Sequence, residues 1–462
     1  MFATPALGGF IKMKTLLLTA LFAVGVIFSC QAYTANDPGQ TISSDGSYAD
    51  TTAALAYVAA KKQDGWVMSV GSPGGSYVWT NTVTIAVTNI FTFQGASPTN
   101  RPTITFGASS YSAGFNVCAK NGKVVTFKDF ILTDVGGGPG NWLLGLFGEG
   151  VCFRVSNVKW VNVNANNAAW VGSINSDTIG GPYGVFDHCE LAASSGSFYG
   201  IFVIDNGCQI HNGWTRPMTW GTTNAVYFED CSAHAQKAIL GRAMVDGFGG
   251  ARVVIRNCNV TNYSIGFHGS QSGAGDSTLQ TEIYNNNIFC NDTVNGMSYI
   301  FWQRGGTGVI FSNTVAESVS QLISSGIWKF SVECASAANW QAEQCARQLI
   351  YTNDYPAPQQ VGRGVVNGAE GTVPIYIWGN SVPGTYYGQS LLGYGDGDQQ
   401  FIQQGRDIFT DGTVMPGYTP LVYPHPLVTS APPVTITTVS TGGSSAGPHP
   451  PSNLLAAPPV NQ

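Results

Sequence analysis

The stretch Val-Val-Ile-Arg-Asn-Cys-Asn-Val at residues 253–260 has apolar residues at its first and third positions, an Asn at its fifth and a Val at its eighth. The same arrangement occurs in Val125–Leu132, Phe153–Trp160, Val226–Ala233 and Val309–Ala316, with Asp or Asn at the fifth position. Period-two alternation is typical of a β-strand whose side chains point alternately to its two faces. Each copy therefore predicts a strand, a turn at the Asn or Asp, and a second strand.

The Asn or Asp position recurs at a nearly constant interval. The resulting anchors are Asp129, Asn157, His188, Asp230, Asn257, Asn285 and Asn313, separated by 28, 31, 42, 27, 28 and 28 residues. Such a unit is too small to bury a core alone, so successive units must stack. Parallel stacking places like residues about 4.8 Å apart, which predicts apolar columns and a column of Asn amides bonded along the stack. Cys189, Cys231 and Cys258 each follow an anchor and are predicted to form a buried column.

The composition agrees with a repetitive β-structure. Gly makes up 58 of 462 residues and charged residues only 10%, against about 7% and about 25% in an average soluble domain. Hydrophobic residues reach 44% and aromatic residues 12%, which excludes disorder for most of the chain. A net charge of −6 with 20 Lys and Arg argues against binding of nucleic acid.

The N-terminus predicts export. A basic start at Met13, an apolar run from Leu16 to Phe28 and a small-residue exit at Ala32 describe a secretory signal peptide over residues 1–32, which starts at Met13 if that is the translated Met. The run is short for a membrane span, and no later stretch has 18 apolar residues. We expect a secreted bacterial protein. A lipobox-like sequence before Cys30 leaves a lipid anchor on the cell surface as an alternative.

Export makes disulfides feasible. Nine Cys remain after cleavage at Ala32, an odd number, and the close pair Cys334 and Cys345 is the expected disulfide. No Cys-x-x-Cys occurs and the Cys are not grouped with His, so a structural zinc site is not predicted.

A block before the repeats favours one known architecture. Residues 50–55 open an amphipathic helix with Leu55, Val58 and Ala59 on one face, followed by a strand at Val67–Val70 and the sequence Ser-Pro-Gly-Gly-Ser-Tyr at 72–77. With the repeats, this block resembles the right-handed parallel β-helix proteins of the pectate-lyase-like superfamily, over residues 41–425. The resemblance implies an all-β solenoid with three strands per coil and an N-terminal capping helix, although Gly75 is an extra residue in the family's spacing.

The domain organisation follows from this interpretation. Residues 33–49 form a lead-in, 50–428 the β-helix with its cap, and 429–462 a Pro-, Ser-, Thr- and Gly-rich disordered tail. The Pro-rich residues 415–427 are expected to seal the last coils. We expect a monomer.

The resemblance also implies where a substrate would lie. In the family, the outer face of the first strand of each coil carries the substrate groove. These strands are expected at Ile201–Asp205, Ile239–Arg242, Ile265–His268 and Ile300–Arg304. Aligned on their leading Ile, they place Arg242 and His268 on neighbouring coils, and Asp205 follows the first of them. Arg242, His268 and Asp205 are therefore the expected catalytic residues.

An insertion points to the same surface. The interval from His188 to Asp230 is about 14 residues longer than its neighbours, and the extra chain at 206–221 is expected to overhang the groove. Aromatic rings stack on sugars and Arg binds carboxylates bidentately. The expected substrate-binding residues are Trp214, Trp220, Arg216, His211, Gln303 and Arg304, although the two Trp could instead pin their own loop.

The chemistry leaves two classes of function open. A polysaccharide lyase needs a base, here Arg242 or His268, and a cation for the substrate carboxylate, here Arg304 or Arg216. A glycoside hydrolase needs two carboxyl groups about 5–10 Å apart, for which only Asp205 and Asp246 are near. No acidic cluster for calcium occurs on these strands, so no cofactor is predicted. The alternative is a non-catalytic glycan-binding or structural adhesion protein at the cell surface.

Overall fold

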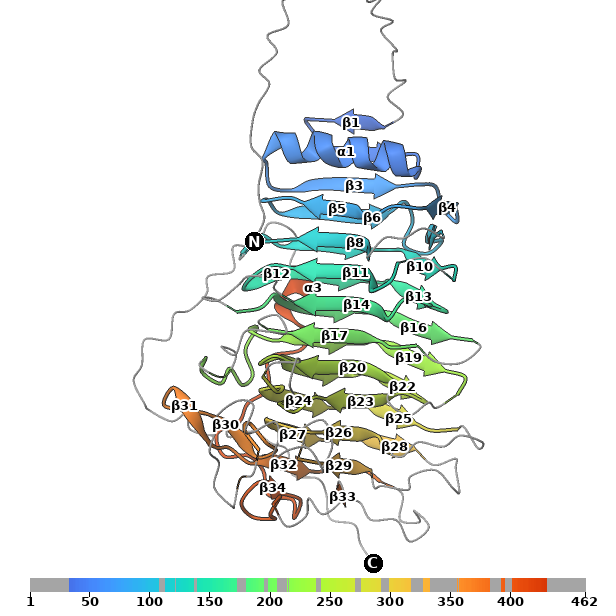
Figure 1. Cartoon of the computed structure of the whole chain (residues 1–462). Coiled ribbons are helices and arrows are strands. Elements are labelled where there is room, and N and C mark those ends of the chain that lie inside the picture. Colours follow the sequence, from blue (N-terminus) through green and yellow to red (C-terminus); the bar gives the residue numbers. More distant parts are fainter. Residues whose placement is uncertain are drawn as a thin grey trace, which may run out of the picture.

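The computed structural model describes residues 33–107, 113–120, 122–136, 139–172, 180–194, 198–205, 214, 216–237, 242–270, 276–291, 299–316, 327–332, 355, 357–382, 392–394 and 401–429. This part of the chain forms a right-handed parallel β-solenoid with about 28 residues per turn and three parallel sheets, as predicted (Figure 1). Each coil passes through sheets A, B and C in turn.

Sheet A comprises β1 (Thr34–Asn36), β2 (Thr41–Ser44), β3 (Trp66–Val70), β6 (Phe91–Gly95), β9 (Val125–Lys128), β12 (Val151–Ser156), β15 (Tyr183–Asp187), β18 (Val226–Glu229), β21 (Arg252–Arg256), β24 (Gln280–Tyr284), β27 (Thr307–Phe311), β32 (Ile375–Trp378) and β34 (Ile408–Phe409). Sheet B comprises β4 (Ser76–Trp79), β7 (Thr103–Phe106), β10 (Ile131–Asp134), β13 (Lys159–Val161), β16 (Glu190–Ala193), β19 (Ser232–Ala235), β22 (Asn259–Thr261), β25 (Asn287–Phe289) and β28 (Thr314–Ala316). Sheet C comprises β5 (Val83–Ala86), β8 (Ala113–Cys118), β11 (Trp142–Phe147), β14 (Asn167–Gly172), β17 (Ile201–Ile204), β20 (Ala243–Phe248), β23 (Ser264–Phe267), β26 (Phe301–Gln303), β29 (Trp328–Phe330) and β33 (Leu392–Tyr394). A separate hairpin pairs β30 (Arg363–Val366) with β31 (Ala369–Thr372).

The anchors of the repeat occupy the turn between sheets A and B. Asp129, Asn157, His188, Asp230, Asn257 and Asn285 all have positive φ, between 52° and 67°. Asn and Asp tolerate this left-handed conformation better than most residues, which explains their recurrence. In the seventh copy the residue with positive φ is Ser312 rather than the expected Asn313.

The amide ladder lies one residue beyond the residues with positive φ. Asn286 and Asn313 are fully buried, and the Oδ1 of Asn313 accepts hydrogen bonds from both the backbone N and the Nδ2 of Asn286, at 3.1 and 2.9 Å. Asn313 in turn donates from Nδ2 to the Oδ1 of Asn380 at 2.9 Å. Because the residue after the anchor points inward, it is this position that can bond along the stack.

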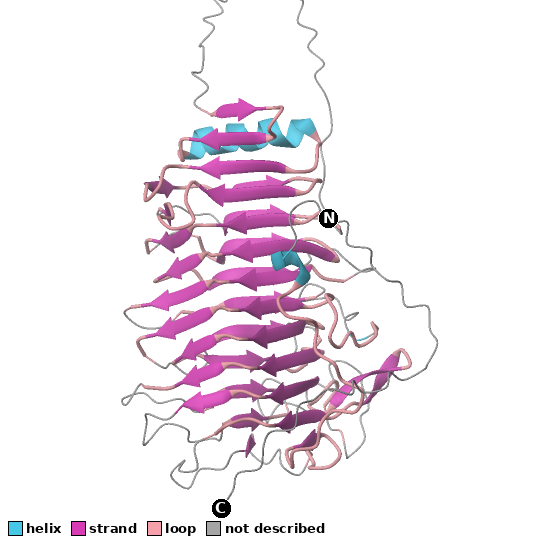
Figure 2. Cartoon of the chain, turned by 180° about the vertical axis from the view of Figure 1, so that it is seen from behind, coloured by secondary structure: helices cyan, strands magenta, loops and turns pink. Residues whose placement is uncertain are grey.

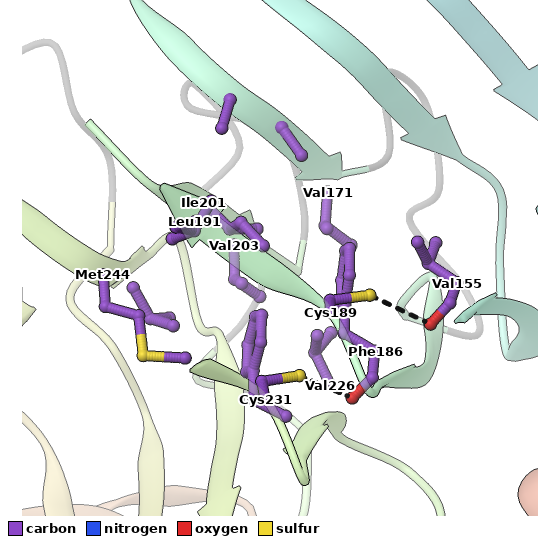
Figure 3. Packing of buried hydrophobic residues seen from close by; sticks show 14 of the residues in the cluster. Val155, Val171, Phe186, Cys189, Leu191, Ile201, Val203, Val226, Cys231 and Met244 are labelled. Atoms are coloured by element: carbon purple, nitrogen blue, oxygen red, sulfur yellow. Dashed lines mark hydrogen bonds between the residues drawn. The ribbon is translucent and has the colours of Figure 1, made fainter. Parts of the chain in front are cut away.

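The three predicted cysteines belong to the same inward column. Cys189, Cys231 and Cys258 are buried free thiols, and the backbone N of Cys258 donates to Asn286 Oδ1 at 2.9 Å. The thiols of Cys189 and Cys231 point to carbonyl oxygens of the preceding coil (Figure 3). The prediction of a buried small-residue column is confirmed.

A helix closes the N-terminal end of the solenoid. Helix α1 (Tyr48–Lys61) begins at Ser47, whose side chain accepts a hydrogen bond from Asp50 N. It buries Ala54, Leu55 and Val58, whereas Ala59 is exposed, contrary to the expected face. The lead-in is part of this cap, because β2 pairs in parallel with β3. The cap covers apolar core and strand edge that the first coil would otherwise expose.

The C-terminal segment does not seal the last coils as expected. Residues 410–429, here called the C-terminal strap, leave β34 and run back along sheet A to helix α3 (Pro426–Thr429), which packs beside β15 (Figures 1 and 2). The strap crosses the outer face of sheet A and covers Glu229 and Arg256, which are fully buried.

Candidate functional site

The outer face of sheet C carries one outward-pointing side chain per coil in register. Its central column, read from the cap toward the last coils, is Thr84, Asn116, Gly145, Trp170, Phe202, Asp246, Gly266, Trp302 and Lys329. The residues on either side of it in each strand, such as Ile201 and Val203, are buried in the core. Alternation therefore directs this column away from the core.

The upper half of this face is aromatic. Trp170 stacks on Trp142 with ring centroids 5.2 Å apart and on Phe202 at 5.8 Å, with interplanar angles of 30° and 6°. Tyr199 packs edge-on against Phe202, and the guanidinium of Arg242 lies 3.9 Å from the Tyr199 ring centroid. Offset stacking is the preferred geometry of such rings.

The middle of the face holds an acid–base cluster. The Nε2 of His268 lies 2.9 Å from Asp246 Oδ2, and Nη2 of Arg304 lies 3.6 Å from Asp246 Oδ1. The His268 side chain is 21% exposed and that of Asp246 10%. The ring of His268 also packs edge-on against Phe248. A carboxylate on one imidazole nitrogen fixes the orientation of the ring.

Cations and rings follow below the cluster. The ring of Trp302 has the guanidinium of Arg304 at 4.3 Å and the ammonium of Lys329 at 4.8 Å from its centroid, and Tyr299 packs beside it. Its indole N–H donates to Ser331 Oγ at 2.6 Å. This part of the face therefore carries positive charge, and cation–π contacts with Trp302 position its two cations.

Gly266 separates the aromatic half from the cationic half. It lies in register between Asp246 and Trp302. A Cβ at this position would meet only Ala243 Cβ at 3.7 Å and Asp246 Oδ1 at 3.9 Å, which are ordinary contacts. The glycine thus leaves the outward column without a side chain directly beside His268 and Asp246.

The expected catalytic residues are not brought together. Arg242 precedes β20, and Ala243 pairs with Ser264, four residues before His268. At about 3.3 Å per residue this places Arg242 about 15 Å from His268 along the strands. The alignment of these strands on their leading Ile was wrong, because Ile201 is in register with Val245 and not with Ile239.

Asp205 and Arg216 belong to a separate, buried network. The Asp205 carboxylate is paired with Arg252 and with Arg216, the latter at 3.1 Å, and accepts hydrogen bonds from Tyr183 Oη and from Gly181 N. Asp205 is only 3% exposed. Its partners hold it in the wall of the solenoid instead of presenting it on the outer face of sheet C.

The remaining expected binding residues are dispersed. Gln303 is in register with Phe267 and faces inward, where it accepts a hydrogen bond from Thr281, because β26 matches β23 from Phe301 and not from Ile300. Arg304 does lie on the outer face. The structure thus retains Arg304 and His268 at the expected surface.

The described residues of the insertion, Trp214 and 216–221, pack against later coils and the C-terminal strap instead of overhanging sheet C. Trp214 is buried with Leu279 and Val365, and its indole N–H donates to Ser277 O at 3.1 Å. Trp220 packs edge-on against Tyr418 of the C-terminal strap. Both Trp therefore pin their own loop. His211, Cys334, Cys345, Cys30 and the signal peptide lie outside the described residues.

Sequence reasoning missed the residues that dominate this face. Trp170 and Phe202 occupy the same position of consecutive strands of sheet C. Their equivalence becomes visible in the sequence only after the register of sheet C is known. The sequence does not fix the position of Asp246, because β20 contains a register shift between Ala243 and Asp246.

No described cluster of three or more His, Cys, Asp or Glu side chains is arranged to bind a metal ion. Among the helices described, none has the length and apolar character needed to span a membrane. No family profile and no curated protein matches this chain.

Proposed function

We propose that the protein is exported and binds a polysaccharide along the outer face of sheet C, with the sugar chain running across successive coils. The supporting observation is that outward rings and cations of sheet C lie on both sides of the cluster formed by His268, Asp246 and Arg304. Aromatic rings suit the apolar faces of sugars, and Gly266 places no side chain of its own beside His268. The pectate-lyase-like resemblance is part of this proposal, since that family uses the equivalent sheet.

We further propose elimination at a uronate unit as the reaction. His268 removes the proton from the carbon next to the carboxylate, and the released electron pair forms a double bond to the neighbouring ring carbon as the bond from that carbon to the glycosidic oxygen breaks. The leaving oxygen takes its proton from water. Arg304 neutralises the substrate carboxylate, and Asp246 orients His268. Within the described strands of sheet C, Asp246 is the only carboxylate, whereas hydrolysis needs two carboxyl groups about 5–10 Å apart.

Binding is tested first. Trp170→Ala and Phe202→Ala should each weaken binding to the preferred member of a polysaccharide panel about 2- to 12-fold, because one ring contact contributes about 0.5–1.5 kcal/mol. Isothermal titration calorimetry measures the effect. Phe289→Ala is the matched control, since Phe289 points outward from sheet B and should leave the affinity unchanged. Equal losses for all three variants, or no binding to any polysaccharide, would refute the site.

Cleavage is tested separately. His268→Gln should lower the rate of appearance of unsaturated uronate ends about 10²- to 10⁴-fold while leaving binding nearly unchanged. Arg242→Gln, at the far end of the strands, should change affinity more than rate. Binding without new ends in the unaltered protein would reject elimination and support the non-catalytic glycan-binding function instead.

A further inference from the structure

The C-terminal strap is attached by side chains rather than by strand pairing. It crosses the strands of sheet A, whose backbone groups are already used in the parallel ladders. Tyr418 Oη donates to Glu282 at 2.7 Å, and the guanidinium of Arg256 donates to the carbonyl oxygens of Leu421 and Val422 at 2.7 and 3.2 Å. These contacts depend on a small set of ionisable side chains beneath the strap.

The far end of the strap depends on a buried histidine. The backbone N of His425 donates to Glu229, and its ring lies 4.7 Å from that of Tyr227. Its Nδ1 accepts a hydrogen bond at 3.2 Å from Leu427 N, in the first turn of α3. His425 therefore caps α3 in its neutral form, with the Nε2 carrying the proton.

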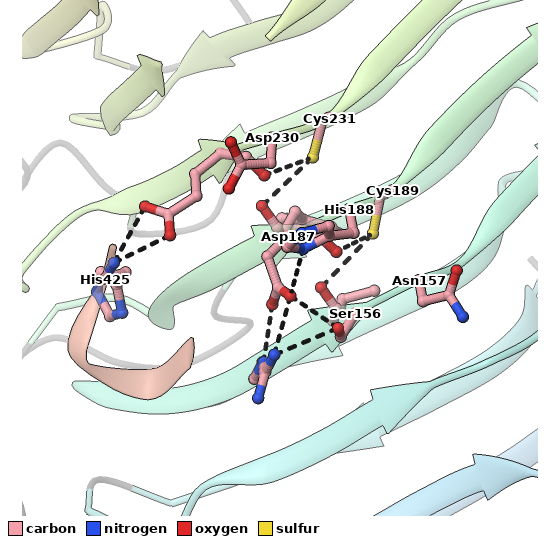
Figure 4. A network of polar contacts seen from close by, with 12 residues as sticks. Ser156, Asn157, Asp187, His188, Cys189, Asp230, Cys231 and His425 are labelled. Carbon is pink, nitrogen blue, oxygen red and sulfur yellow. Dashed lines mark hydrogen bonds and ion pairs between the residues drawn. The ribbon is translucent and has the colours of Figure 1, made fainter. Parts of the chain in front are cut away.

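A second proton on this ring has no place in the docked strap. Protonation of Nδ1 would set two donors, Nδ1–H and Leu427 N–H, against each other. Arg256 lies close by and is itself tied to Glu229 by two hydrogen bonds of 2.8 and 2.6 Å. The charged groups that face His425 are Glu229 of β18, Arg256 of β21, Asp187 of β15 and Arg154 of β12. Figure 4 shows His425 and Asp187 in this network.

We infer that the C-terminal strap is an acid-released clamp, in which protonation of His425 undocks residues 415–429 from sheet A and frees residues 216–221. The insertion is coupled because Trp220 packs on Tyr418 and Gly221 N donates to Glu282, the same carboxylate that binds Tyr418. This inference concerns sheet A and stands apart from the proposed glycan site.

The direction of the pH effect follows from proton linkage. Burial, followed by the charge of Arg256, lowers the pKa of His425 from 6.5 to about 3. A lowered pKa in the docked state means that docking is fully supported above pH 6.5 and weakens as the pH falls toward 3. Burial raises the pKa values of Glu229 and Glu282, which acts in the opposite sense. The histidine contribution must therefore be measured by difference.

Hydrogen exchange of peptides from 415–429, corrected for intrinsic rates between pH 4 and 7.5, measures undocking in the unaltered protein and in His425→Asn. Asn retains an acceptor for Leu427 N but does not titrate. The ratio of the two opening constants should rise up to tenfold per pH unit below about pH 6.5, since one proton is linked. Peptides from 216–224 should open together with the strap, while β6 and β9 remain protected.

Controls separate this effect from general acid unfolding. His234→Asn, on the exposed face of sheet B, should follow the unaltered protein at every pH. His425→Gln repeats the comparison if Asn undocks the strap already at pH 7.5. The inference would be overturned if the unaltered protein and the docked His425 variant gave parallel pH curves. It would also be overturned if His425→Asn and His425→Gln both undocked the strap at neutral pH. Simultaneous loss of protection in β6 and β9 would do so as well.

Discussion

A carboxylate paired with a cation contributes differently to stability in the wall and on the surface of this solenoid. Asp205 is surrounded by two guanidinium groups and is almost fully buried. Glu190 pairs with Lys159 at 2.9 Å on the exposed face of sheet B, where both side chains keep about a third of their surface in water. Solvent screens the second pair but not the first.

Asp205→Asn should therefore lower the free energy of unfolding by about 3–5 kcal/mol, because Arg252 keeps a buried charge without its countercharge. Glu190→Gln is the matched carboxylate-to-amide control, and it should cost at most about 1 kcal/mol. Denaturant unfolding monitored by tryptophan fluorescence provides both values. Similar costs for the two variants would show that Asp205 is not part of a closed ionic network.

At the scale of the element, the turn between sheets A and B combines two requirements in adjacent residues. The anchor must adopt a left-handed backbone, and the next residue must point into the core. Cys fills that inward position in three consecutive coils and Asn in the following ones. The inward amides bond to each other and to backbone groups, so each links neighbouring coils.

Asn313→Ala should destabilise the protein by about 3 kcal/mol, since it leaves Ile283 O, Asn286 N and the Asn380 amide without their buried partner. Asn287→Ala, on the exposed face of sheet B, removes one amide contact at 3.2 Å and should cost less than about 0.5 kcal/mol. Thermal unfolding by circular dichroism distinguishes them. Equal melting temperatures would contradict a structural role for the inward ladder.

These elements also explain how much could be predicted from sequence. The anchors were correct at Asp129 through Asn285 because few residues adopt their backbone conformation, whereas three strands per coil was an expectation from the family resemblance. The predicted register of sheet C was wrong, because the turn from sheet B to sheet C varies in length. Arg242 and Gln303 were therefore assigned to the wrong strand positions. The strap contact between Arg256 and Leu421 joins residues 165 apart, which no local pattern reveals.

At the scale of the whole molecule, stability depends on the two ends and on what crosses the coils. Each coil contacts its neighbours in the stack, so an uncovered end exposes core and strand edge at once. Helix α1 and β2 perform this covering at the N-terminal end. Leu55 and Val58 are the apolar side chains that join the helix to the core.

Leu55→Lys should lower the free energy of unfolding of the cap by about 2–5 kcal/mol, because it replaces a buried apolar contact by a charge. Ala59→Lys, on the exposed side of the same helix, should change it by less than about 0.5 kcal/mol. Hydrogen exchange should show the loss in β2 and β3 before β18 and β21. Uniform loss along the solenoid would contradict nearest-neighbour stability.

The backward course of the C-terminal strap determines how the molecule would respond to mechanical tension. A pull applied beyond Thr429 is first felt at α3, beside β15 in the middle of the stack, and not at the final coil. Its attachments at Glu229, Arg256 and Glu282 then lie in series and detach one at a time. Tension would detach the strap from sheet A before any coil unfolds, so the strap would protect the solenoid against forced unfolding.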